Sequence, residues 1–245
     1  MKYLAFIVSV LFFSCQRGEV SIYTEYLNHN DTVRYIGKEQ CRACHAEIYD
    51  SYMQTGMGKS FHFATKDHSA LSHSEMPIIK DTIKNLSYQP FWKNDSLYLK
   101  EFRIIGKDTT HKLIKKVNYK IGSGNHTNSH LFEINGYVHQ MPYTFYTQDK
   151  IADFPPGFEN GNNTRFSREI GLECMSCHNA YPEHAEGSNN QYKAISSGID
   201  CERCHGPGEV HVKQKLAGII IDTSKYIDYS IVNPKRLPLD LQFDV

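Results

Sequence analysis

Residues 174–178 read Cys-Met-Ser-Cys-His, and residues 201–205 read Cys-Glu-Arg-Cys-His. The same pattern occurs once earlier in the chain, where residues 41–45 read Cys-Arg-Ala-Cys-His. Two cysteines at this spacing can each bond to one porphyrin, and the adjacent histidine is then held beneath the iron as its axial ligand. The three copies therefore predict three haem c groups. The attachment cysteines are Cys41, Cys44, Cys174, Cys177, Cys201 and Cys204, and the proximal ligands are His45, His178 and His205.

The main alternative is a zinc site, because the cysteine pairs of residues 174–177 and 201–204 could together form a tetrahedral thiolate cage. The separation of the two pairs is longer than the usual zinc-ribbon spacing. A zinc cage also does not explain why a histidine follows the second cysteine every time, including His45, which has no partner pair nearby. The residues around the pairs do not predict the βαβ context of a thioredoxin-like motif either. We therefore favour haem attachment.

The composition sets broad limits on the class of protein. At 245 residues the chain can form one large domain or two small ones. Hydrophobic residues make up 40% and the mean hydropathy is -0.50, so the chain is poor in core-forming residues, and haem could supply apolar core. Lys plus Arg equals Asp plus Glu at 27 each, which argues against a nucleic-acid-binding protein.

Residues 1–15 have the features of an export signal. Lys2 is followed by an apolar run over residues 3–13 that is too short to span a bilayer. Cys15, the one cysteine outside the haem motifs, directly follows, as in a bacterial lipoprotein signal, although Phe12 stands where such signals favour leucine. Ordinary secretion with cleavage nearby is the alternative. Both interpretations place the protein on the periplasmic or cell-envelope side, and the first anchors it to a membrane. We expect residues 16–34 to form a tether.

Two helices are predicted next to the motifs. Residues 46–53 have apolar and aromatic side chains at helical spacing, and we expect this helix to pack on the first haem. Gly206-Pro207-Gly208 should end any helix of the third motif, and residues 209–216 should form a new one. That places His211 on the first turn of the second helix.

Residues 76–146 have β-branched and aromatic residues and short turn signals in place of helical periodicity. They predict a small antiparallel sheet inserted between haem-binding segments. Asn94-Asp95 should form a turn between two of the strands, and Asn135-Gly136 is the strongest hairpin signal. Glycines in Gly122–His126 would present His126 on a loop, with a solvent-exposed turn as the alternative. The residues after Ile219 show no clear closing element. The expected strands cover residues 88–92, 96–105, 111–121, 131–134 and 137–141.

The chain resembles bacterial multihaem c-type cytochromes related to the tetrahaem cytochromes of the c-554 type. The similar blocks are Tyr35-Ile36-Gly37, Gly56-Met57-Gly58-Lys59-Ser60, Gly122–His126, residues 177–182, and residues 198–208 with His211. The resemblance implies an α+β, haem-packed fold with short helices and long loops. It also implies that distant histidines supply the second axial ligands, with His126 and His211 as the leading candidates. Met57 and His62 are further candidates after the first motif.

The resemblance also suggests a domain plan. It implies a cytochrome domain over residues 35–245, with the β-rich insertion at 76–146 and the paired motifs at 170–216. Relatives often carry another haem motif after a segment like residues 236–240, and many carry tetratricopeptide repeats beyond it. Because this chain ends at Val245, a truncated cytochrome is one interpretation.

We expect an exported electron carrier served by the cytochrome c maturation machinery and by a redox partner that the sequence does not identify. One alternative is an oxidoreductase that acts on a small nitrogen or sulfur compound at an open haem iron. Another is a structural or sensory haem module of a longer repeat protein. Ten of the 13 histidines lie outside the motifs, enough to close every iron. We interpret His29, His68, His73 and His111 as surface residues.

Overall fold

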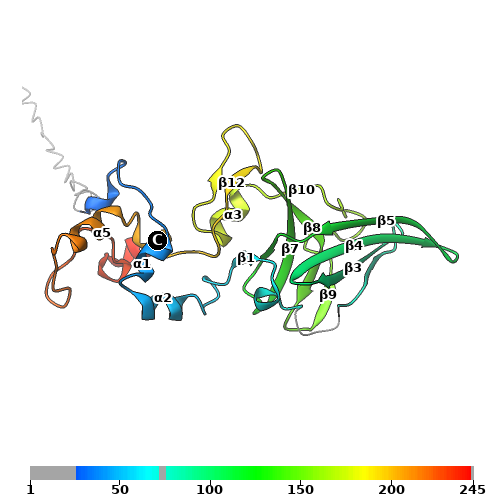
Figure 1. The fold of residues 1–245 in the computed structure, drawn as a ribbon, viewed down its shortest axis with the longest axis horizontal. Coiled ribbons are helices and arrows are strands. Elements are labelled where there is room, and N and C mark those ends of the chain that lie inside the picture. The colour runs from blue at the N-terminus through cyan, green and yellow to red at the C-terminus, as the bar shows by residue number, and fades with distance from the viewer. Residues whose placement is uncertain (1–25, 72–75, 244–245) are drawn as a thin grey trace, which may run out of the picture.

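The computed structural model describes residues 26–71 and 76–243. The expected export signal, Cys15, the first part of the tether and His73 lie outside these residues. The described protein mixes short helices with antiparallel strands, in agreement with the α+β prediction. It is elongated, with helices gathered at one end and long strands extending to the other (Figure 1). In the part of the chain that is described, no helix is long and apolar enough to cross a membrane.

The strands form two main antiparallel sheets, where the sequence predicted a single small one. One sheet has the order β1-β6-β7-β8-β10 with β9 beside β8, and the other has the order β2-β3-β4-β5. Buried side chains of both sheets share one hydrophobic cluster, with Leu97 and Leu99 from the second sheet and Phe132 and Tyr143 from the first. β11 and β12 form a separate pair. The bounds are β1 Phe61–Phe63, β2 Ile79–Asp81, β3 Leu86–Lys93, β4 Ser96–Ile105, β5 Asp108–Lys116, β6 Tyr119–Ile121, β7 Thr127–Ile134, β8 Tyr137–Tyr146, β9 Ile151–Asp153, β10 Arg168–Glu169, β11 Glu183–His184 and β12 Tyr192–Ala194.

The chain changes sheets within the segment 111–121, which the sequence predicted to be one strand. The N–H of Val117 still bonds to the carbonyl of Leu97 in the second sheet, at 2.9 Å. The N–H of Asn118 instead bonds to the carbonyl of Leu131 in the first sheet, also at 2.9 Å. Strand propensity continues across this point, so local sequence did not reveal that β5 and β6 belong to different sheets.

Both predicted two-residue hairpin turns are confirmed. Lys93 pairs with Ser96 around Asn94, whose φ is 55°. In the β7–β8 hairpin the turn residues Asn135 and Gly136 have φ values of 52° and 83°. Asparagine and glycine tolerate this left-handed conformation, which matches the twist of the flanking strands.

The helices are short and cluster near the motifs. The predicted helices are confirmed as α2, which ends at Tyr52, and α5. Gly206, with φ 71°, ends α4 as expected. The bounds are α1 Lys38–Arg42, α2 Ala46–Tyr52, α3 Leu172–His178, α4 Glu202–His205, α5 Glu209–Leu216 and α6 Leu239–Gln242, with the 3-10 helices η2 Leu27–His29, η3 Lys66–His68 and η4 Pro234–Arg236.

Two segments are more ordered than the sequence suggested. Within the expected tether, Tyr26 and Asn28 are buried, and the N–H of Leu27 bonds to the carbonyl of Tyr229 at 2.8 Å. The segment after Ile219 forms η4 and α6 rather than running on without a closing element. The two segments pack on each other and on the third motif, and these long-range contacts carry no local sequence signal.

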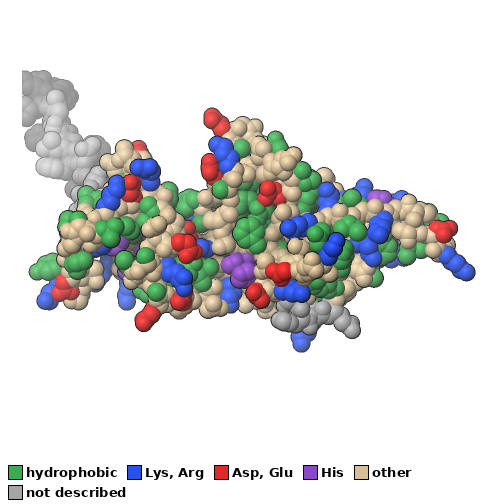
Figure 2. Space-filling model, viewed as in Figure 1, with side chains coloured by type: hydrophobic (Ala, Val, Ile, Leu, Met, Phe, Trp, Pro, Cys, Tyr) green, Lys and Arg blue, Asp and Glu red, His purple; other side chains and the backbone are tan. Residues whose placement is uncertain are grey.

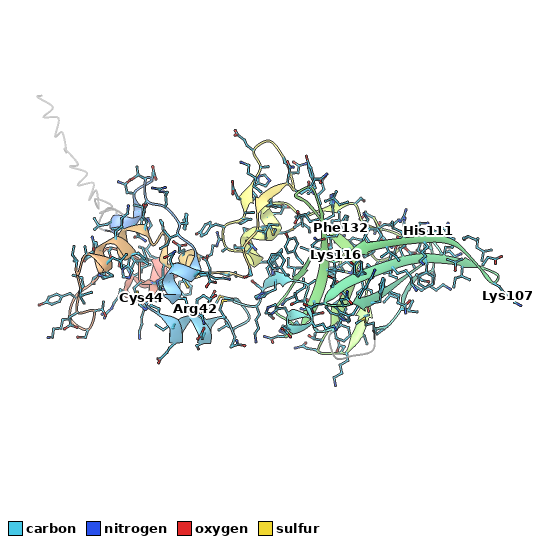
Figure 3. The ribbon with its side chains drawn as sticks, viewed as in Figure 1. Arg42, Cys44, Lys107, His111, Lys116 and Phe132 are labelled. Carbon is cyan, nitrogen blue, oxygen red and sulfur yellow. The ribbon has the colours of Figure 1, made fainter. Side chains whose placement is uncertain are left out.

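Charges are mixed along the visible face of the molecule. On the face shown in Figure 2, basic and acidic side chains are interspersed over both ends. This distribution matches the formal net charge of zero. Arg42 and Cys44 lie at the helical end, whereas Lys107 and His111 lie far away on the long strands (Figure 3).

Candidate haem-binding sites

The first and third motifs adopt the same backbone turn. The carbonyl oxygen of Cys41 accepts hydrogen bonds from the backbone N–H groups of Cys44, at 3.2 Å, and His45, at 2.9 Å. The first cysteine of the third motif accepts the equivalent two bonds, at 3.2 and 3.0 Å. The second motif lies within α3. All six motif cysteines are free thiols with at least partial exposure, as covalent attachment requires.

The first and third motifs lie side by side, although their first cysteines, Cys41 and Cys201, are 160 positions apart in the sequence. The thiols of Cys41 and Cys201 interact with each other, which raises the pKa of Cys41 and lowers the pKa of Cys201. The hydroxyl of Tyr52, at the end of α2, donates to the carbonyl of Ile199 at 3.1 Å. The first candidate haem site is therefore a neighbour of the third candidate site.

Glu202 joins these two motifs through its carboxylate. Its side chain belongs to the third motif and is almost completely buried. The carboxylate accepts the backbone N–H groups of Ile36 at 3.0 Å, Gly37 at 2.7 Å and Gly208 at 2.7 Å. The first two donors lie just before the first motif. Sequence reasoning missed this role, because Glu202 occupies a position that the haem motif leaves unspecified.

The second motif contacts the third motif and the segment that follows α2. A guanidinium nitrogen of Arg203, in the third motif, donates to the carbonyl of Ser176 at 2.8 Å. The hydroxyl of Ser60 donates to the carbonyl of His178 at 2.7 Å. Burial lowers the pKa of His178, and its Nδ1 is buried without a hydrogen-bond partner among the described residues. Met175 is completely buried and anchors α3 on the sheet.

His211 faces His45 of the first motif. The rings of His45 and His211 are 6.4 Å apart between centroids and inclined by only 22°. The Nδ1 of His211 lies 2.9 Å from the hydroxyl of Ser230, which itself donates to Asp228 at 2.5 Å. Because the Ser230 hydrogen is used there, Nδ1 of His211 is the donor, and its Nε2 is left without the proton.

His205 of the third motif has the same tautomer. Its Nδ1 lies 2.7 Å from the carbonyl oxygen of Val232. A carbonyl can only accept, so Nδ1 carries the proton and Nε2 has a lone pair available for a metal.

The other predicted ligands are placed differently. His126 is exposed on its loop, whose Gly122 donates to the carbonyl of Ser60 at 2.7 Å. Met57 is half exposed. Nε2 of His62 lies 3.1 Å from the carbonyl oxygen of Gly58, so Nε2 carries the proton. Burial, with the nearby charges of His68 and Lys120, lowers the pKa of His62 to about 4.

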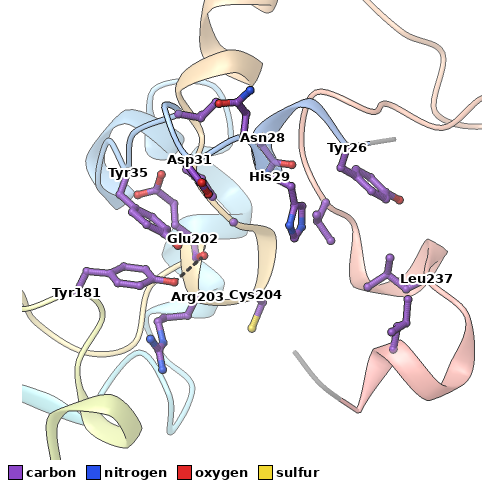
Figure 4. Close-up of a pocket in the computed structure, with 16 residues that line it drawn as sticks. Tyr26, Asn28, His29, Asp31, Tyr35, Tyr181, Glu202, Arg203, Cys204 and Leu237 are labelled. Carbon is purple, nitrogen blue, oxygen red and sulfur yellow. Dashed lines mark hydrogen bonds between the residues drawn. The ribbon is translucent and has the colours of Figure 1, made fainter. Parts of the chain in front are cut away.

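A cavity of about 420 Å³ opens beside the third motif. Its size falls in the range of known ligand sites. The Cys204 thiol and the His29 ring both project into this space, with Leu237 on the far side (Figure 4). Sequence reasoning set His29 aside as a surface residue. The residues that line the cavity are Tyr26, Asn28, His29, Asn30, Asp31, Val33, Tyr35, Tyr181, Glu202, Arg203, Cys204, Gly206, Pro207, Val232, Leu237 and Leu241.

The cysteine pairs do not converge as a zinc cage would. Among residues 26–71 and 76–243, no group of three or more His, Cys, Asp or Glu side chains is arranged to hold a metal ion. The pattern of two thiols and one histidine per site instead fits a metal held within a porphyrin.

Comparison with known proteins finds similarity to one family model over part of the chain and to one solved structure. Residues 156–206 match the family model of cytochrome c554 and c-prime, and this span holds the second and third motifs. The crystal structure of the outer cell wall cytochrome OcwA is similar over 75% of this chain and 34% of that chain, with 15% identity and a TM-score of 0.42. The chain thus spans about a third of the length of that cytochrome. No curated protein matches the sequence.

Proposed function

We propose that the protein is an exported electron carrier of the multihaem c-type cytochrome class with three haem c groups. The match of residues 156–206 to the cytochrome c554 and c-prime family supports this proposal. The proposed number of haems rests on the three attachment motifs. The paired rings of His45 and His211 support a closed, low-spin iron at the first motif. Bound haem would supply reversible one-electron chemistry, and the polypeptide would set its potential.

The first iron fits His45 and His211 as its two axial ligands. Bonds between metals and imidazole nitrogen are about 2 Å long, so two imidazoles on opposite sides of one iron have ring centres roughly 6 Å apart. The observed separation of 6.4 Å and the near-parallel rings agree with this arrangement. The hydrogen bond from Nδ1 to Ser230 orients His211 and keeps its Nε2 unprotonated.

For the second iron, His178 and His126 are the proposed ligands. Ser60 supports this pairing, because its hydroxyl bonds to the carbonyl of His178 and its own carbonyl accepts the N–H of Gly122. The loop that carries His126 therefore lies close to the second motif. His62 is a weaker candidate, because its Nε2 is protonated and bonded to Gly58.

Contacts between the motifs support electron transfer among the haems. Cys41 meets Cys201, and Arg203 bonds to Ser176, so the third motif touches both others. Electrons could thus pass between neighbouring haems within one chain. Export, with lipid on Cys15 as the membrane anchor, is supported by the sequence of residues 1–15 and by the need to attach haem c outside the cytoplasm.

Haem quantitation with absorption and EPR spectra of the exported protein tests this proposal. We expect three covalent haems per chain, all low spin. Replacing Cys174 and Cys177 by alanine should remove one haem, and an unchanged haem count would refute the attachment assignment. Cys15→Ser is the matched control, because it should keep three haems and release the protein from the membrane fraction.

Variants test the axial ligands separately. His211→Ala and His126→Ala should each convert one haem to high spin, because one iron loses its second nitrogen ligand. A low-spin spectrum that survives either change would show that the assignment of that histidine is wrong.

The cavity at the third motif favours one alternative, a multihaem oxidoreductase acting on a small nitrogen or sulfur compound. A cavity beside Cys204 could admit substrate to an open iron. The spectra decide between the two functions. If nitrite or cyanide changes the spectrum of one haem, the iron is open and the carrier proposal fails. If neither changes it, the oxidoreductase is excluded.

A further inference from the structure

We propose that His29 is the second axial ligand of the third haem and closes the iron that His205 holds. This inference rests on the proposed function, because it requires a haem on Cys201 and Cys204. It goes further by naming a ligand that lies in the expected tether, outside every haem motif.

The segment that carries His29 is fixed directly to the third motif. The side-chain amide of Asn28 donates to the carbonyl of His205 at 2.9 Å, and Asn28 is completely buried. The same amide nitrogen lies only 2.7 Å from where a Cβ on Gly206 would be. On the other side, the N–H of Leu27 bonds to the carbonyl of Tyr229. These contacts therefore fix the position of the backbone around His29 relative to the third motif.

The cavity places His29 where a haem attached to Cys204 would lie. Both side chains project into the same space (Figure 4). Val232 links the two sides of the site, because it lines the cavity and its carbonyl accepts Nδ1–H of His205. Apolar walls suit a porphyrin plane, and they are formed by Val33, Pro207, Val232, Leu237 and Leu241.

The chemistry of the lining favours His29 over its neighbours. Proteins ligate haem iron through histidine, cysteine, methionine or tyrosine. Cys204 would be used in the thioether bond. The rings of Tyr35 and Tyr181 lie 3.9 Å apart, and the ring of Tyr26 packs against the rings of Tyr229 and His29. His29 supplies the imidazole of the lining, and it is exposed along the cavity.

The test uses His29→Gly in the full exported protein. We expect one of the three haems to become high spin, with the haem count still three. Added imidazole should return that haem to low spin, because it enters the site that the side chain left. His111→Gln is the matched control, since His111 lies on β5 far from the motifs (Figure 3) and should leave the spectrum unchanged. An unchanged spectrum in His29→Gly would overturn the proposal.

A second variant guards against a change in folding. His29→Met offers a thioether at the same place, and a methionine ligand raises the potential of a haem relative to a bis-histidine one. A redox titration should show one midpoint potential rise while the other two stay unchanged. Three unchanged potentials would overturn the assignment of His29. Fewer than three haems in the wild-type protein would instead show that the proposed haem complement is wrong.

Discussion

The carboxylate of Glu202 makes a specific prediction about stability. Glu202→Gln keeps the shape of the side chain but removes its charge and one acceptor oxygen. The buried carboxylate now accepts three backbone N–H groups, from Ile36, Gly37 and Gly208. In the variant, the amide group of glutamine would face one of these donors and leave it without a partner.

The magnitude follows from the hydrogen bonds. A hydrogen bond to a charged group contributes roughly 1.5–3 kcal/mol, and a buried donor left unpaired costs roughly 1–3 kcal/mol. We therefore expect Glu202→Gln to lower the free energy of unfolding by roughly 2–4 kcal/mol. For a chain of this length, the midpoint of thermal unfolding should fall by roughly 5–15 °C.

The assay is thermal unfolding of the holoprotein, followed by circular dichroism. Glu209→Gln is a close control, because Glu209 also accepts a backbone N–H, from Arg34 at 2.9 Å, but at the protein surface. Its effect should be much smaller, because solvent replaces the lost bond. If the two variants have equal midpoints, the carboxylate of Glu202 does not hold the first and third motifs together as the contacts imply.

Three further predictions concern other parts of the molecule. Asp228→Asn should raise one haem midpoint potential in a redox titration, because it removes negative charge and weakens the hydrogen-bond network behind His211. Burial lowers the pKa of His130 from 6.5 to about 4, so the unfolded chain binds more protons in this window. The unfolding midpoint should fall as pH drops from 6.5 to 4, and less so in His130→Gln. Glu101→Gln removes the charge of a buried carboxylate that bonds to the partly exposed side chains of Arg165 and His111, and it should lower the free energy of unfolding by roughly 1–3 kcal/mol while leaving the haem spectra unchanged.

Local signals predicted the local structure well. The haem motifs, α2, α5 and the hairpin turns at Asn94 and Asn135 each depend on residues close together in sequence. The exchange of sheets at Val117 and Asn118 did not have such a signal, because strand propensity is high on both sides. Hydrophobic pattern therefore predicted the strands but not the partners of β5 and β6.

The long-range features of the site were beyond prediction for a related reason. The bond from Gly37 to Glu202 joins residues 165 positions apart, and the bond from Asn28 to His205 joins residues 177 positions apart. The segments around Gly37 and Asn28 have no amphipathic periodicity from which their contacts with the third motif could be predicted. Polar segments of this kind read as tethers, although contacts with the third motif order them.

The contacts of the third motif matter for function because this motif lies between the other two. It touches the first motif through Cys201 and Glu202, and the second through Arg203. The spatial order of the motifs is thus first, third, second, and electrons moving between the outer haems would pass through the third. A substrate bound at that iron would interrupt the path. Closure of the third site by His29 would leave the middle haem free for transfer, which is the arrangement expected of a carrier.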